Sequence, residues 1–264
     1  MRRVYDFEAV SIGSEQTMVR RNEMTLRRTQ VSPRVYARIG GILYLMIIIA
    51  GALGEIFIRG TLIVSGDAIA TANNIIASQS LWRIGIAGNI LMHMFDIPLM
   101  LVFYVLLKPV NKNLALLAIL FNLIQTAVLV ANKLNLLMPL FFLGNADYLK
   151  VFNPNQLYAL SYLFVRAHDY GFGVGLLFFG FACLIYGYLL FRSGYFPKPL
   201  GVLMAIAGLS YLTNSIALLL APDYAAKILP VLGLALIGEL SLGLWLLIKG
   251  VDLPAWEKHV LASV

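Results

Sequence analysis

The chain has 264 residues, of which 60% are hydrophobic and 12% are charged, and its formal net charge is +7. Roughly a quarter of the residues in an ordinary soluble domain are charged, so this composition excludes a soluble globular protein. Several apolar runs approach the length of about 20 residues that a helix needs to cross a bilayer. The chain is therefore predicted to be a polytopic helical membrane protein.

The positive charge is concentrated before the first apolar run. Eight arginines lie between Arg2 and Arg38. A short basic segment next to an apolar run is typical of a membrane-proximal arm, not of a folded nucleic-acid-binding domain. We therefore expect residues 1–38 to form a basic, flexible cytoplasmic arm, and we expect no nucleic-acid partner.

Six apolar runs follow, each bounded by Gly, Pro, Asn or charged residues. They cover residues 39–58, 82–107, 114–134, 159–191, 200–220 and 228–248. None alternates as a barrel strand does, and backbone groups in lipid must be satisfied within their own segment. Residues 39–250 are thus predicted to form an all-α bundle of six transmembrane helices, followed by a short cytoplasmic tail at 251–264. The polar connections at 60–81 and 138–158 have room for short surface helices.

The distribution of lysine and arginine predicts the orientation of the bundle. If the N-terminus is cytoplasmic, the segments on that side hold fourteen Lys and Arg residues, and the outside loops hold only Arg59, Lys150 and Lys227. The positive-inside rule then places both termini in the cytoplasm.

Residues in the last three runs resemble a known family. The sequence GYLLFRSGYFPKPLG at 187–201, with FFGF at 178–181, GE at 238–239 and LWLL at 244–247, is similar to a bacterial and archaeal membrane family called domain-of-unknown-function family 4386. The resemblance covers about 34–251. It implies a multi-pass protein of a bacterial or archaeal cytoplasmic membrane. It carries no assigned activity and therefore no catalytic residue.

Polar side chains inside the apolar runs are the candidate functional residues, because they are costly in lipid. At 1.5 Å per residue, an inner set lies about 14–24 Å above the cytoplasmic face, near the bilayer midplane. An outer set lies about 30–38 Å above that face, at the mouth of the bundle. The inner set is Glu55, His93, Asp96, Asn122, Gln125, Asn214 and Glu239. The outer set is Arg83, Lys133, Arg166, His168 and Asp169.

Many of these residues also have a purely structural interpretation. The amides of the inner set are typical of hydrogen bonds between membrane helices. Long basic side chains of the outer set, such as Lys133, are expected to extend to the outer interface. His168 and Asp169 are expected to form an interfacial pair. His93, Asp96 and Glu239 lie deep enough to favour a functional role.

Two functions fit this pattern best. In the first, His93, Asp96 and Glu239 bind or move a small solute, an ion or a proton in a midplane pocket that opens outward. In the second, the chain is a non-catalytic sensor or scaffold whose arginine arm lies on anionic lipid or a cytoplasmic protein.

Two further alternatives require histidines at one height. An intramembrane zinc-dependent lipid hydrolase needs three side-chain ligands, and a bis-histidine haem needs His93 and His168 on one iron. His168 lies about 13 Å above His93, which disfavours both. We therefore assign no catalytic residue, metal ligand or cofactor, and we expect membrane lipids and a small solute or ion as partners.

Overall fold

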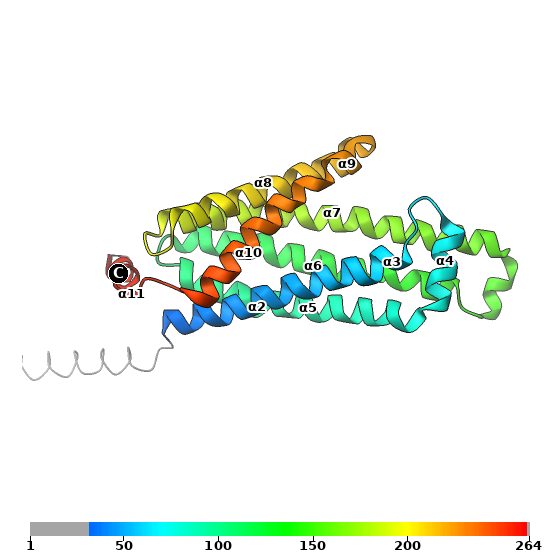
Figure 1. Ribbon diagram of the computed structural model, residues 1–264, viewed down its shortest axis with the longest axis horizontal. Helices are drawn as coiled ribbons and strands as arrows, with labels where there is room; N and C mark the ends of the chain where they lie inside the picture. The colour runs from blue at the N-terminus through cyan, green and yellow to red at the C-terminus, as the bar shows by residue number, and fades with distance from the viewer. Residues whose placement is uncertain (1–31, 263–264) are drawn as a thin grey trace, which may run out of the picture.

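The computed structural model describes residues 32–262 (Figure 1). It contains six helices that are long and apolar enough to cross a membrane. The first is α2 (Pro33–Leu53), which continues through the π-helix η1 (Gly54–Arg59) and α3 (Gly60–Leu62). The others are α5 (Gln79–Leu107), α6 (Lys112–Phe142), α7 (Pro154–Arg192), α8 (Lys198–Leu220) and α10 (Leu232–Ile248). No strand occurs between residues 32 and 262. The predicted all-α membrane bundle is confirmed.

Shorter helices occupy the connections and the end of the chain. They are α4 (Ala68–Ala77), η2 (Asp147–Val151), α9 (Pro222–Ile228), η3 (Leu229–Val231) and α11 (Leu253–Ala262). Helix α4 packs on α7 at the end of the bundle opposite to α11 (Figure 1). The two long polar connections therefore hold short helices, as predicted.

Five of the six spanning helices begin two to six residues before their apolar runs, and α10 begins four residues inside its run. Asn111 caps α6 by accepting a hydrogen bond from the amide of Leu114, at 3.0 Å. Asn153 and Gln156 form a reciprocal capping box at the start of α7, and Pro33 occupies the first turn of α2. Caps and prolines fix helix starts independently of hydropathy. Residues 33–38, predicted as part of the arm, are therefore helical, and most of the arm (1–31) lies outside the described residues.

The six spanning helices pack in a ring that follows chain order. Helix α2 packs on α5, α5 on α6, α6 on α7, α7 on α8 and α8 on α10, and α10 closes the ring against α2. The beginning of α2 and helix α11 lie at the same end of the bundle (Figure 1), as an even number of spans requires. The side of the membrane that this end faces stays a prediction from the charge distribution.

Two joints of the ring depend on glycine. A Cβ atom at Gly187 of α7 would lie 2.7 Å from the carbonyl oxygen of Gly201 in α8. A Cβ atom at Gly41 of α2 would clash with the backbone of Leu247 in α10. Small residues allow membrane helices to approach this closely. The absence of side chains at these positions brings α7 onto α8 and α10 onto α2.

The turn between α7 and α8 is held by a buried tyrosine. Tyr195 is 3% exposed, and its hydroxyl donates a 2.6 Å hydrogen bond to the carbonyl oxygen of Leu106 near the end of α5. Burial raises the pKa of the Tyr195 phenol well above its ordinary value. Gly194 precedes it with a φ of 71°, a conformation that favours glycine. This turn, part of the stretch that resembles a known family, fixes one end of the ring.

We predict that Gly187→Ala lowers the free energy of unfolding by about 1–3 kcal/mol, because the added methyl group meets backbone atoms that cannot move independently. The matched control is Gly88→Ala on α5, where an added Cβ has nothing within 4 Å. That change should leave stability unchanged or raise it by up to about 1 kcal/mol. Equal effects of the two substitutions on unfolding in mixed micelles would contradict the packing described.

Candidate functional site

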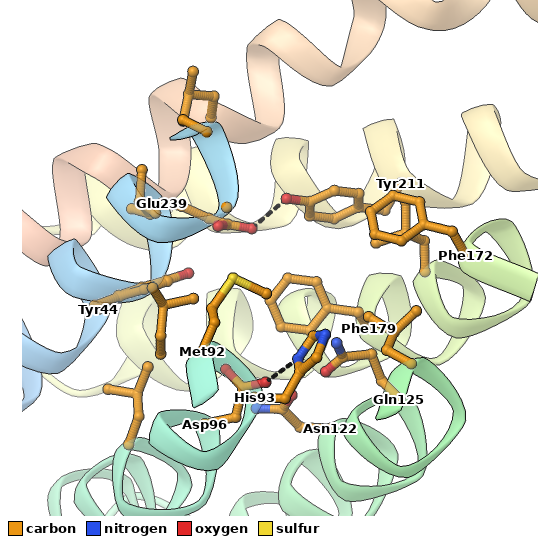
Figure 2. A pocket seen from close by; sticks show the side chains of 18 of the residues that line it. Tyr44, Met92, His93, Asp96, Asn122, Gln125, Phe172, Phe179, Tyr211 and Glu239 are labelled. Atoms are coloured by element: carbon orange, nitrogen blue, oxygen red, sulfur yellow. Dashed lines mark hydrogen bonds and ion pairs between the residues drawn. The ribbon is translucent and has the colours of Figure 1, made fainter. Parts of the chain in front are cut away.

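A cavity of about 420 Å³ lies inside the ring, and all six spanning helices contribute to its wall (Figure 2). This volume is within the range of small-molecule sites. Six of the seven residues of the inner set line it, namely Glu55, His93, Asp96, Asn122, Gln125 and Glu239. Asn214 is buried in α8 but is not part of this wall. The predicted common depth thus corresponds to a common cavity.

Glu239, on α10, is the most enclosed acidic residue of the cavity wall and lies next to α8. Glu239 is only 8% exposed, and the hydroxyl of Tyr211 donates a 2.5 Å hydrogen bond to its Oε1 atom. The hydroxyl of Tyr44, on α2, points toward the same carboxylate (Figure 2). Neither tyrosine was singled out from the sequence. The signal was present, since a phenol in the middle of an apolar run needs a hydrogen-bond partner.

His93 and Asp96 form a second polar group on the opposite wall. The Nδ1 atom of His93 lies 3.0 Å from Oδ2 of Asp96, which also accepts a 3.2 Å hydrogen bond from Thr126 of α6. An ionised carboxylate only accepts, so Nδ1 carries the proton, and in the neutral form of the imidazole Nε2 is an acceptor. This Nε2 atom is buried and has no hydrogen-bond partner within residues 32–262. The cavity wall therefore contains an unused acceptor.

The remaining wall is largely apolar and aromatic. Its rings are those of Tyr44, Phe103, Phe172, Phe179, Tyr186 and Tyr211. Three carboxylates line the cavity, and no Lys or Arg is found among its described lining residues. The wall is therefore negatively charged when these carboxylates are ionised, and this charge favours a positively charged occupant.

The cavity opens on the half of the bundle away from α11. Its exposed rim is formed by Ala52 of α2, Glu55 and Ile56 of η1, Phe172 of α7 and Leu236 of α10. The side chain of Glu55 is 67% exposed. Glu55 is therefore the most exposed acidic residue of the cavity wall, and Glu239 is the most enclosed.

A second polar cluster lies one helical turn beyond the rim and joins η1, which continues α2, to α6 and α7. Arg59 approaches His168 Nδ1 with Nη1 at 2.7 Å and donates from Nη2 to Asp169 Oδ1 at 2.5 Å. Lys133 Nζ lies 3.2 Å from His168 Nε2. Arg166 donates to Asp169 Oδ2 at 3.2 Å. Because Arg59 and Asp169 belong to helices on opposite sides of the ring, this outer cluster ties the two sides together.

Four of the five residues of the outer set meet in this cluster, and Arg83 does not, because its side chain is exposed on α5. Lys133 is only 3% exposed, so the expectation that it extends to the interface was wrong. Arg59 was predicted in an outside loop, but α2 continues through a π-helix that carries it to the cluster. A π-helix is rare and leaves no clear mark on an apolar pattern.

The two histidines lie in different clusters, one in the cavity wall and one beyond the rim. The part of the chain that the structure describes contains no group of three or more His, Cys, Asp or Glu residues arranged to hold a metal. The geometry therefore lends no support to a shared haem or to a zinc-dependent hydrolase.

We predict that Asp169→Asn lowers the free energy of unfolding by about 2 kcal/mol, because the hydrogen bond from Arg59 loses the negative charge of its acceptor. Arg166→Ala is the matched control, since Arg166 binds the same carboxylate from a side chain that is 48% exposed. Removal of an exposed partner should change stability by less than about 1 kcal/mol. Equal losses in denaturation experiments would show that Asp169 does not join the helices.

Comparison with known proteins gives the family of the chain. The family described as "Domain of unknown function (DUF4386)" matches residues 39–250. A protein from Archaeoglobus fulgidus, described as uncharacterized, is 30% identical over 166 residues, which are 62% of this chain and 83% of that relative. No solved structure matches the chain. The six-span bundle described above therefore belongs to the DUF4386 family of multi-pass membrane proteins.

Proposed function

We propose that this membrane protein binds a small, positively charged solute or ion in the cavity at the centre of its ring. The observation that carries the proposal is Glu239, a carboxylate enclosed by aromatic and aliphatic side chains. Two features support a ligand there: a cavity of suitable size, and polar groups from several helices that converge on it.

The charge balance of the cavity supports a cation as the ligand. Among residues 32–262, no Lys, Arg or His nitrogen lies within 4 Å of the Glu239 carboxylate. A buried charge without an opposite partner is costly. A bound cation would supply this partner when the carboxylate is ionised.

The position of the cavity rim supports entry of the solute from one side of the membrane only. The rim lies on the half of the bundle away from α11, and the outer cluster lies beyond it. With the termini in the cytoplasm, as the lysine and arginine distribution predicts, that half faces the outside of a bacterial or archaeal cytoplasmic membrane. Passage of the solute to the other side would require the buried end of the cavity, near Tyr44 and Phe103, to open.

We predict that Glu239→Gln abolishes cation binding. Purified protein is heated with Na⁺, Mg²⁺, 2-phenylethylammonium or its N,N,N-trimethyl analogue, all as chloride salts. A ligand at a hundred times its Kd stabilises the native state by about 2.7 kcal/mol, so at least one cation should raise the midpoint of thermal unfolding of the unmodified protein. The same cation should have no effect on Glu239→Gln.

The matched control is Glu257→Gln, which removes an exposed carboxylate from α11, and it should respond as the unmodified protein does. The proposal fails if no cation stabilises the unmodified protein. It fails equally if Glu239→Gln retains the full response.

We predict that a cysteine in the α3–α4 connection is labelled from outside intact cells. The free Cys183 is fully buried, so it can stay in place. Ser65 and Lys258 are both exposed and lie at opposite ends of the bundle. A membrane-impermeant maleimide should modify Ser65→Cys in intact cells and Lys258→Cys only after lysis. The reverse pattern would overturn the orientation.

A further inference from the structure

We propose that the solute is a protonated amine that carries at least one N–H group and an apolar body. This inference rests on the proposed function, because it assigns a chemical class to the cation in the same cavity. Three features of the wall carry it: an unused nitrogen acceptor, two separated carboxylates and an aromatic lining.

The unused acceptor is Nε2 of His93. The residue is 3% exposed and lines the cavity, and this nitrogen is buried without a hydrogen-bond partner in the described chain. The Nδ1 atom lies 3.0 Å from the Asp96 carboxylate, and with the proton on Nδ1 the Nε2 atom of a neutral imidazole is an acceptor. Leaving such an atom unpaired is costly. An ammonium N–H of the ligand would pair it, whereas a quaternary ammonium ion has no proton to offer.

The carboxylates are placed to stabilise an ammonium charge and not to enclose a bare metal ion. Asp96 and Glu239 come from α5 and α10, on different walls, and each already accepts a hydroxyl hydrogen bond. Ca²⁺ takes six to eight oxygen ligands at short distance, and Mg²⁺ takes an octahedral set. Residues 32–262 contain no such convergence of acidic and histidine side chains. An ammonium group donates at most three hydrogen bonds and needs no full shell of oxygen ligands, so it tolerates this separation.

The aromatic lining suits the apolar part of an amine. The rings of Phe179 and Tyr211 lie 5.2 Å apart between their centroids and form one side of the cavity. Aromatic faces attract ammonium ions through their quadrupoles, and they also remove the hydrocarbon part of a ligand from water. Met92 and Met204 complete the wall with side chains that adapt to different shapes. An anion would find no Lys or Arg partner among the described residues of this wall.

The test compares three ligands with one carbon skeleton in isothermal titration calorimetry: 2-phenylethylammonium, its N,N,N-trimethyl analogue and neutral 2-phenylethanol. For the unmodified protein we expect the ammonium ion to bind about tenfold more tightly than the trimethyl analogue, because a charge-assisted hydrogen bond to His93 is lost on methylation. The alcohol should bind most weakly.

The variant His93→Phe keeps an aromatic side chain and removes the acceptor. It should bind the ammonium ion and the trimethyl analogue with nearly equal affinity. His93→Gln restores an acceptor oxygen and should recover part of the preference. If His93→Phe does not fold, the comparison of ligands on the unmodified protein and on His93→Gln still decides the question.

Failure of this inference differs from failure of the proposed function. Equal binding of both cations by the unmodified protein, with both lost in Glu239→Gln, overturns the amine and leaves cation binding intact. A preference that survives in His93→Phe also overturns the role of His93. If neither organic cation binds and no inorganic cation stabilises the protein, both proposals are wrong.

The ammonium group can come from a free amine or from a lipid headgroup, and nanodiscs distinguish the two sources. The affinity for 2-phenylethylammonium is measured in phosphatidylglycerol discs with and without phosphatidylethanolamine. Competition by phosphatidylethanolamine identifies a lipid headgroup as the natural occupant of the site. Unchanged affinity identifies a free amine.

Discussion

Closure of the ring is the constraint on which the rest of this structure depends. Glu239 and Asp96 lie in helices that cross the membrane, and a charged side chain facing lipid at the bilayer centre costs about 2.5–3.5 kcal/mol or more. Packing of α10 on α2, at the close approach of Gly41 to Leu247, completes the enclosure. The same closure that protects the carboxylates from lipid creates the cavity they share.

The polar groups within the ring divide into two sites with different roles. In the outer cluster, Arg59, Lys133 and His168 already contact one another or Asp169, and their contacts tie α2, α6 and α7 together. In the cavity, His93 keeps a free acceptor and the carboxylate of Glu239 has no cationic partner among the described residues. Polar groups that contact one another across helices stabilise a fold, whereas polar groups that converge on an open volume are expected of a binding site.

The sequence predicts the helices and most polar residues of the cavity wall. A polar residue inside an apolar run is visible in the sequence, and its height in the bilayer follows from its position along the helix. A helical ruler placed His93, Gln125 and Glu239 at one depth, and the structure brings them to one cavity. The sequence could not reveal that Tyr211 binds Glu239, because that pairing depends on which helices are neighbours. The hydropathy pattern also placed Arg59 in a loop, because the π-helix that extends α2 is a local backbone feature with no hydropathy signal.

The central claim is that the enclosed carboxylate of Glu239 holds a small cation. Native mass spectrometry of the protein, extracted gently from its own membrane, tests this most directly. The account predicts a single small cationic molecule bound to the unmodified protein and to Glu257→Gln, and absent from Glu239→Gln. It is contradicted if the unmodified protein carries no such molecule, or if Glu239→Gln retains it.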